Sequence, residues 1–385
     1  MISLLLLLAL QAKPERPHDE SMLVTVAKDA KLPHLALDAD GNAYVAFARN
    51  GNIELAVSTD GGKTFSPPVT ALNANGRDAG IANRGPRVSV DKSKRIYVSG
   101  PLFREAPVND LYFAVSTDHG KTFSKPFLIN DAPGSAADSV HAAAAGPGDL
   151  HVAWVDSKNN KRSLLYARFD TGGKRSGKIT PITGFCCEYC PPGLAVDGIG
   201  NPTVAWREAP RDPAAAKDTG RQIFLSRSSD GGKSFAPAVQ LNSIDSGLTE
   251  CPQDAPAAAL TGDGKLIAAA WMERRDVERD ADVFWTYGAP GKLKSDTSCH
   301  DDRRYQQRRP TLAIDADGTV WCAWEDSRQT TLRVFFTWSK TEFNVPLADP
   351  KELPSSWPSL ASAGPKVAVA YQLGKDVAFR VLATK

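Results

Sequence analysis

The segment STDGGKTF (residues 58–65) recurs as STDHGKTF (116–123) and as SSDGGKSF (228–235). All three copies fit the pattern Ser-x-Asp-x-Gly-x-(Ser/Thr)-Phe. The Ser and Asp side chains of such a segment can accept hydrogen bonds from turn N–H groups, and the glycine can adopt a positive φ. The motif therefore predicts a hairpin turn with an aromatic ring packed beneath it, which is a folding device and not a catalytic one.

The spacing of the copies indicates an internal repeat. Asp60 and Asp118 lie 58 positions apart, and Asp118 and Asp230 lie 112 apart, which is two steps of 56. A weaker copy, FDTGGK (169–174), lies where the intermediate step requires one. A period of this length is typical of a protein built from similar supersecondary units.

A second pattern runs through the whole chain and consists of an apolar strand, a turn and another apolar strand. Its seven copies are LALDADGNAYVAF (35–47), VSVDKSKRIYVSG (88–100), AAAAGPGDLHVAW (142–154), LAVDGIGNPTVAW (194–206), ALTGDGKLIAAAW (259–271), LAIDADGTVWCAW (312–324) and SLASAGPKVAVAY (359–371). We therefore expect an all-β protein, a β-propeller of seven blades with four antiparallel strands each; six blades is the alternative.

The two ends of the chain predict how the ring closes. The last unit offers only three strands, while MLVTVA (22–27) is a lone strand ahead of the first unit. Pairing of 22–27 with the strand near 376–382 would remove the exposed edges of an open array.

The extreme N-terminus resembles an export signal. ISLLLLLAL (2–10) is a short apolar run, followed by Gln11 and Ala12 and then by a polar stretch. We expect a signal peptide at 1–12, a single propeller domain at 13–385, and a secreted or periplasmic protein; a buried strand is the alternative for the apolar run. Nine residues are too few to span a membrane. The 46 basic and 44 acidic residues nearly cancel, which argues against nucleic acid as a partner.

Charged residues follow four of the aligned hairpins, on the face opposite the Ser-x-Asp turns, where the long loops lie. Four arginines are candidates to bind a ligand carboxylate, because a guanidinium can hold a carboxylate with two hydrogen bonds: Arg207, Arg274, Arg304 and Arg328. Four further residues are candidates for nucleophile chemistry: Glu208, Glu273, Glu325 and Tyr305. The alternative is a solvated rim with internal ion pairs. No cofactor is predicted.

The Ser-x-Asp segments resemble the Asp-boxes of the sialidase (neuraminidase) superfamily. That resemblance implies exo-hydrolysis of sialosides by an arginine triad, a Tyr nucleophile paired with a Glu, and an Asp acid/base. The family's early Phe-Arg-Ile-Pro signature is absent, and Arg84 or Arg87 is only a loose substitute for its arginine. FCCEYCPP (185–192) and ECPQDAP (250–256) look like segments of uncharacterised bacterial sialidase-like exported proteins.

Two functions remain open at this point. The first is an exo-glycoside hydrolase that acts on sialic-acid-type or other acidic glycans. The second is a non-catalytic propeller that binds a glycan, a protein partner or a metal through its Cys- and Arg-rich loop face.

The six cysteines fall into two groups. Cys322 occupies a position that is Val or Ala in the other hairpins, so we expect a buried core thiol. The other five are placed on loops of the expected functional face: Cys186, Cys187, Cys190, Cys251 and Cys299. One interpretation is disulfides between neighbouring loops, with Cys251 bonded to Cys186, Cys187 or Cys190. The other is a copper or zinc site formed by thiolates and His300.

Overall fold

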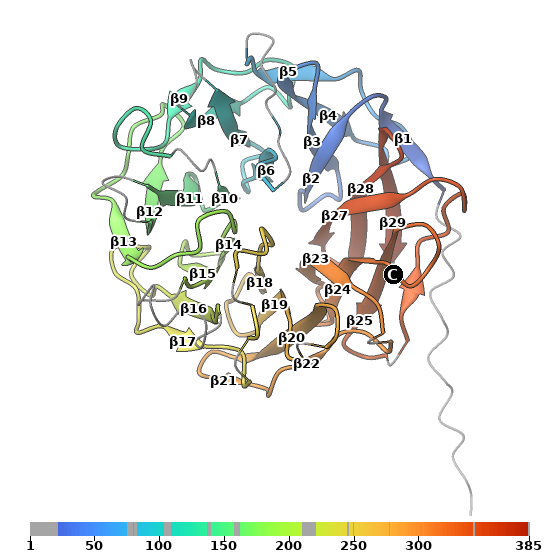
Figure 1. The fold of residues 1–385 in the computed structure, drawn as a ribbon. Coiled ribbons are helices and arrows are strands. Elements are labelled where there is room, and N and C mark those ends of the chain that lie inside the picture. Colours follow the sequence, from blue (N-terminus) through green and yellow to red (C-terminus); the bar gives the residue numbers. More distant parts are fainter. Residues whose placement is uncertain are drawn as a thin grey trace, which may run out of the picture.

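Seven four-stranded units form a ring around a central axis in the computed structural model (Figure 1). The structure describes residues 22–74, 80, 83–103, 109–136, 140–157, 162–209, 221–244, 246–248, 250–276, 278–302, 304–341 and 343–383. The predicted signal peptide at 1–12 lies outside these residues. Within them there is no helix, and consequently none with the length and apolar character needed to cross a membrane.

The blades follow one another along the chain. Blade 1 consists of β2 (Lys31–Leu37), β3 (Ala43–Arg49), β4 (Asn52–Ser58) and β5 (Val69–Leu72). Blade 2 consists of β6 (Arg87–Val90), β7 (Ile96–Phe103), β8 (Asn109–Ser116) and β9 (Phe127–Leu128). Blade 3 consists of β10 (His141–Ala145), β11 (Leu150–Asp156), β12 (Ser163–Phe169) and β13 (Thr180–Thr183). Blade 4 consists of β14 (Gly193–Val196), β15 (Pro202–Arg207), β16 (Ile223–Arg227) and β17 (Val239–Gln240).

The last three blades vary the same plan. Blade 5 consists of β18 (Ala257–Leu260), β19 (Ile267–Glu273), β20 (Asp282–Ala289) and β21 (Lys292–Leu293), and the extra strand β22 (Thr297–Ser298) also pairs with β20. Blade 6 consists of β23 (Gln307–Ile314), β24 (Val320–Asp326), β25 (Arg333–Trp338) and β26 (Val345–Pro346). Blade 7 consists of β27 (Ser355–Ala363), β28 (Lys366–Leu373), β29 (Asp376–Ala383) and β1 (Val24–Ala27). Seven blades of four antiparallel strands confirm the predicted fold class.

The ring closes through the N-terminal strand. β1 runs antiparallel to β29, with Val24 opposite Phe379 and Ala27 opposite Val377. Blade 7 therefore combines the two ends of the described chain, and the predicted closure is confirmed.

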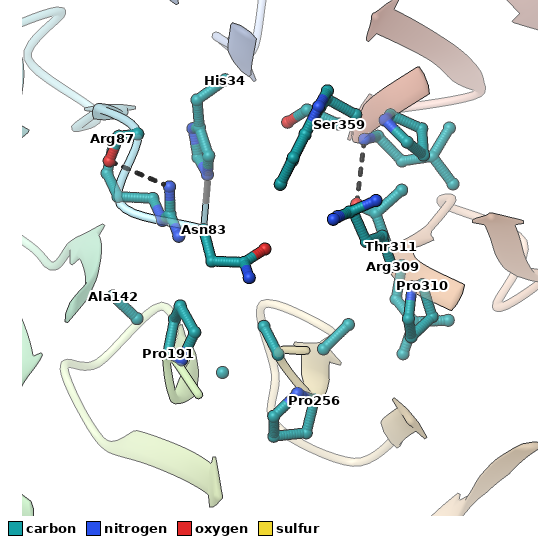
Figure 2. Close-up of a pocket in the computed structure, with 18 of the residues that line it drawn as sticks. His34, Asn83, Arg87, Ala142, Pro191, Pro256, Arg309, Pro310, Thr311 and Ser359 are labelled. Atoms are coloured by element: carbon teal, nitrogen blue, oxygen red, sulfur yellow. Dashed lines mark hydrogen bonds between the residues drawn. The ribbon is translucent and has the colours of Figure 1, made fainter. Parts of the chain in front are cut away.

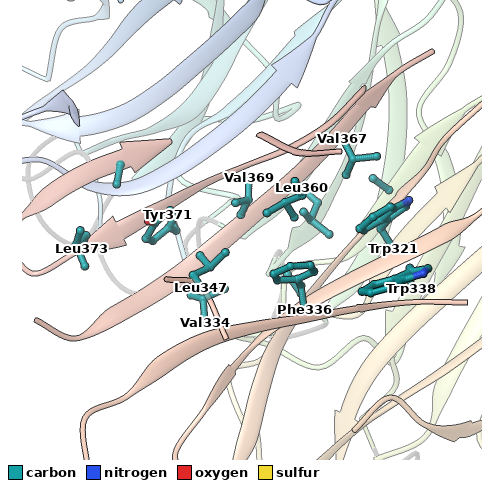
Figure 3. Close-up of a cluster of buried hydrophobic side chains, with 14 residues drawn as sticks. Trp321, Val334, Phe336, Trp338, Leu347, Leu360, Val367, Val369, Tyr371 and Leu373 are labelled. Atoms are coloured by element: carbon teal, nitrogen blue, oxygen red, sulfur yellow. The ribbon is translucent and has the colours of Figure 1, made fainter. Parts of the chain in front are cut away.

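The cores lie between neighbouring blades, because the second strand of each blade is buried on both faces. Figure 3 shows one such layer between blades 6 and 7, where Trp321, Phe336 and Trp338 stack beside Leu360 and Val369. The aromatic residues that end four of the aligned hairpins are fully buried in these layers: Trp154, Trp206, Trp271 and Trp324. The hairpins of two apolar strands that recur in the sequence thus form the packing surfaces that hold adjacent sheets together.

The Ser-x-Asp turns have the hydrogen bonds that the sequence predicts. Ser58 donates to Asp60 (2.8 Å) and accepts from the Gly62 amide (2.9 Å). Asp60 also accepts from the Thr64 amide (3.0 Å). At Gly62 φ is +95°, and a Cβ would come within 2.2 Å of the Phe379 ring, so the turn needs a glycine where it docks on blade 7.

Asp60→Ala and Asp118→Ala are each expected to lower the melting temperature, because turn N–H groups lose their acceptor. Hydrogen bonds from Thr64 and Thr122 hold the pKa of the two carboxyls well below the usual range. Their contribution is therefore present above the unfolded-state pKa of about 4 and is lost as the pH falls through the lower folded-state pKa. Thermal melts at pH 7 and pH 3 measure both effects, and ligand binding should not change; a folded variant that lost binding would contradict this assignment.

Candidate functional site

A cavity of about 290 Å³ opens on the propeller axis and is lined by the first strands of all seven blades (Figure 2). The lining residues lie where these strands begin. In a four-stranded antiparallel blade the turns after strands 1 and 3 share one face, so the beginning of strand 1 lies on the other. The cavity is therefore on the face opposite the Ser-x-Asp turns, where the functional loops were expected.

Prolines surround the mouth of this cavity. In six of the seven blades a proline lies five positions before the turn residue that follows or ends the first strand: Pro33, Pro86, Pro192, Pro256, Pro310 and Pro358. All of them except Pro86 line the cavity, and Pro86 lies between the lining residues Gly85 and Arg87. Proline has no N–H to donate to a sheet and so suits the beginning of a strand. Sequence analysis missed this series, although its constant spacing from the turns could have revealed it.

Three of these prolines follow a residue with left-handed backbone. Leu32, Arg309 and Trp357 have φ of +55°, +54° and +53°, and each lies at an irregularity in the pairing of its strand. Such conformations are costly for residues with a side chain and persist only where the surroundings impose them. All three residues line the cavity, so the irregularities place their side chains at the axial mouth.

The residue after the proline links neighbouring blades. His34 accepts a hydrogen bond from the Val88 amide (3.2 Å), and Ser359 accepts one from the Leu35 amide (2.9 Å). Burial, with the nearby charge of Arg87, lowers the pKa of His34 to about 3, so its imidazole is neutral and can act as an acceptor. These contacts fix the inner strands and thereby the shape of the cavity.

Arg87 lines the cavity on the β6 side. Its guanidinium donates to the carbonyl oxygens of Gly85 (3.2 Å) and Pro86 (2.9 Å). Among the described residues it has no carboxylate partner, and burial lowers its pKa to about 10. An anion placed beside Arg87 would relieve that cost, because the charge-assisted hydrogen bonds replace lost hydration.

Arg309 lies across the cavity on blade 6. It forms an ion pair with Glu325 (2.5 Å), and its guanidinium lies over the Trp357 ring, 3.8 Å from the centroid. The buried Glu325 also accepts from Arg308 (2.9 Å) and from the Trp357 amide (2.8 Å). Glu325 therefore holds both Arg309 and Trp357 in place.

None of the described residues that line the cavity is acidic, so Arg87 and Arg309 line it without a carboxylate among those residues. Behind the wall, Asp254 accepts from the Arg309 amide (2.8 Å), while its other carboxylate oxygen has no hydrogen-bond partner among the described residues. Burial raises the pKa of Asp254 to about 6. A carboxyl shifted in this way beside a cavity is typical of functional sites. Sequence analysis quoted this segment without singling out Asp254.

No protein-family model and no curated protein matches this chain. Solved structures match its fold. A PL25 ulvan lyase bound to -[GlcA(1-4)Rha3S]- has a TM-score of 0.57 at 10% identity, with 95% of this chain and 98% of that chain covered. The leech intramolecular trans-sialidase complexed with 2,7-anhydro-Neu5Ac has a TM-score of 0.50 at 14% identity, with coverages of 82% and 68%. This chain has a sialidase-like propeller fold. It spans 66% of the chain of the NanB sialidase from Streptococcus pneumoniae.

None of the eight residues predicted as catalytic lines the axial cavity of this sialidase-like propeller. Glu325 contacts two residues that do line it, Arg309 and Trp357. Arg304 is exposed and paired with Asp302 (2.8 Å), and it lies against Tyr305, which is 37% exposed. Their catalytic roles stay predictions.

The other predicted residues lie at the ends of second strands or just beyond them. Arg207 is fully buried and donates to the carbonyl oxygens of Arg221 (3.1 Å) and Met272, so it joins blades 4 and 5. Glu273 is buried beside Arg275, and burial raises its pKa. The remaining positions are Glu208, which is buried, Arg274, which is half-buried, and Arg328, which is paired with Asp326 (2.8 Å) and Asp301 (2.5 Å).

The structure groups the six cysteines differently from what the sequence predicts. Cys322 is a buried core thiol, as expected, but Cys299 packs in the same apolar cluster and not in a loop site. Cys186 is buried in another apolar cluster. Cys187, Cys190 and Cys251 gather at one point between blades 4 and 5, and all six cysteines are free thiols in the structure.

Proposed function

We propose that this protein binds a carboxylate-bearing glycan at the axial cavity. The observation that carries the proposal is that Arg87 and Arg309 line opposite sides of a cavity whose described lining residues include no Asp or Glu. Arginine suits a sugar carboxylate because its planar fork matches the two oxygens. Trp357 adds an aromatic surface of the kind that contacts the apolar side of a sugar ring.

The size of the cavity limits what enters it. About 290 Å³ is near the lower end of small-molecule sites, which begin at about 300 Å³. The cavity therefore suits one terminal acidic sugar, with the rest of the glycan outside. The ulvan lyase and the leech trans-sialidase were each solved with an acidic sugar, which supports this class of ligand.

Hydrolysis of the bound glycan is a second candidate function, favoured by Asp254. A carboxyl with a pKa of about 6 is partly protonated at neutral pH, and Asp254, which does not itself line the cavity, could pass that proton to a leaving group through one water molecule. In that case turnover of a fluorogenic sialoside or glucuronide falls as the pH rises above 6, and Asp254→Asn abolishes it. Lack of turnover in the wild-type protein would leave the binding function alone.

Calorimetric titration tests the binding function. We expect the wild-type protein to bind sialyllactose or a glucuronate-terminated oligosaccharide and not lactose. Arg87→Gln should weaken that binding by about 10- to 150-fold, since a charge-assisted hydrogen bond contributes about 1.5–3 kcal/mol.

Arg279→Gln is the matched control, because Arg279 is an exposed arginine that pairs with Asp276 (3.2 Å) and is not among the residues that line the cavity. Its effect on affinity should be small. Equal affinities of the Arg87→Gln variant and the wild-type protein, with the fold verified by circular dichroism, would rule out the axial cavity as the carboxylate site.

A further inference from the structure

Three cysteine sulfurs meet behind the wall of the axial cavity. The Sγ of Cys187 lies 3.0 Å from that of Cys251 and 3.2 Å from that of Cys190, and the third separation is 3.5 Å. Cys187 and Cys190 form a Cys-x-x-Cys segment after blade 3, and Cys251 comes from the loop before blade 5. We call these three side chains the sulfur triad.

Hydrogen-bond donors point at two of the three sulfurs. The Arg221 guanidinium donates to the Cys187 sulfur (3.3 Å). Backbone N–H groups of Gln253 and Tyr189 point at the Cys251 sulfur, and Gln253 has left-handed backbone (φ +53°). Donors directed at sulfur in this way are typical of the surroundings of metal-bound thiolates, where they orient the ligand.

Three thiolates this close together would repel one another, and they would need more positive charge than the single guanidinium of Arg221 at the Cys187 sulfur supplies. A bound metal ion provides that charge, and ligand thiols deprotonate when it binds.

We propose that Cys187, Cys190 and Cys251 bind one thiophilic metal ion, of the Zn²⁺ or Cu(I) class, between blades 4 and 5. Three sulfurs are soft ligands that select these ions over Mg²⁺ or Ca²⁺. An ion about 2.3 Å from each sulfur would lie above the plane of the triangle, and the sulfurs would have to move apart by a few tenths of an ångström to reach the edge of about 3.8 Å that a tetrahedral site requires, which leaves one coordination position open. Zn²⁺ would take a water there, whereas Cu(I) would need no fourth ligand.

The proposed ion would also stabilise the site described above. Cys190 directly precedes Pro191 and Pro192, and Cys251 lies shortly before Ala255 and Pro256, and these four residues line the cavity. A metal would therefore tie together the two loops that form one side of the axial mouth.

Metal titration of the reduced, chelator-treated protein without oxygen tests the proposal. Co²⁺ is the spectroscopic probe, because thiolate ligation produces an intense near-ultraviolet charge-transfer band. We expect the band to saturate at one Co²⁺ per chain and to disappear when one equivalent of Zn²⁺ is added. Separate titrations with Zn²⁺ and with Cu(I), each followed by competition with a chelator specific for that ion, then show which is held more tightly.

Cys251→Ser should abolish the band, and Cys186→Ala should retain it, since Cys186 is an adjacent cysteine whose side chain packs in an apolar cluster. If Cys251→Ser does not fold, thiol counting on the wild-type protein replaces it, and metal should protect three thiols from alkylation. Absence of a charge-transfer band would overturn the proposal. So would a stoichiometric disulfide from Cys251 to Cys187 or Cys190 in protein isolated without reductant.

Discussion

Removal of residues 13–28 is expected to open the ring and to lower the melting temperature sharply. The deletion takes away β1, the only partner of β29 on that side, and leaves an exposed sheet edge. It also removes Val26 and Ala27, which are buried in the core between blades 1 and 7. Lost ladder hydrogen bonds at about 1 kcal/mol each, together with the exposed apolar surface, amount to several kcal/mol.

Deletion of residues 13–21 alone is the control, because it leaves β1 in place. Differential scanning calorimetry compares the two deletions with the protein that begins at residue 13. A melting temperature unchanged by removal of 13–28 would show that pairing of β1 with β29 does not hold the ring together.

Glu325→Gln is expected to have the largest effect of any single substitution near the cavity. Glu325 is fully buried, and its carboxylate accepts hydrogen bonds from Arg308, Arg309 and the Trp357 amide. Neutralising it leaves the two arginines without their negatively charged partner, and because Arg309 and Arg308 are 18% and 36% exposed the cost should stay below the about 3–5 kcal/mol of breaking a fully buried ion pair. Urea unfolding measures this loss, and affinity for the acidic glycan should fall as well because Arg309 and Trp357 are released.

Glu352→Gln, at an exposed position, should leave both properties unchanged. The outcome also decides between two roles for Glu325. A variant that keeps its stability and its glycan affinity but loses turnover of a sialoside would favour the nucleophile chemistry that the sequence suggested, and it would contradict the positioning role described here.

The architecture could be predicted because the sequence repeats it. Seven hairpins at a regular spacing fix the blades, and a lone strand at 22–27 beside an incomplete last unit fixes the closure. The repeat can be recognised even where the turn motif is incomplete. The carboxylate of Asp170, for example, still accepts hydrogen bonds from the Gly172 and Lys174 amides.

The cavity could not be predicted in the same way, because it depends on where individual side chains point. Arg207 follows an Ala-Trp pair and was expected to reach a ligand, but it lies between two blades and donates to backbone carbonyls. Arg309 lines the cavity because its backbone is left-handed before a proline, and Arg87 does so from the beginning of β6. The alignment of the hairpins does not show which side chains point into the cavity, whereas the constant position of the prolines marks the strand segments that line it.

The sulfur triad lies between these two cases. Sequence analysis grouped Cys187, Cys190 and Cys251 on loops before consecutive blades, which was sufficient to make them neighbours. It also included Cys299, which the structure places in the core beside Cys322, because the extra strand β22 carries it inward. No repeat in the sequence marks that strand.

A crystal structure of the protein with a bound glucuronate-terminated oligosaccharide tests the central claim most directly. We predict that the terminal carboxylate lies on the propeller axis within hydrogen-bonding distance of the Arg87 guanidinium, with Arg309 and Trp357 in contact with the same sugar. An oligosaccharide bound elsewhere on the protein, with the axial cavity containing only water, would contradict the account.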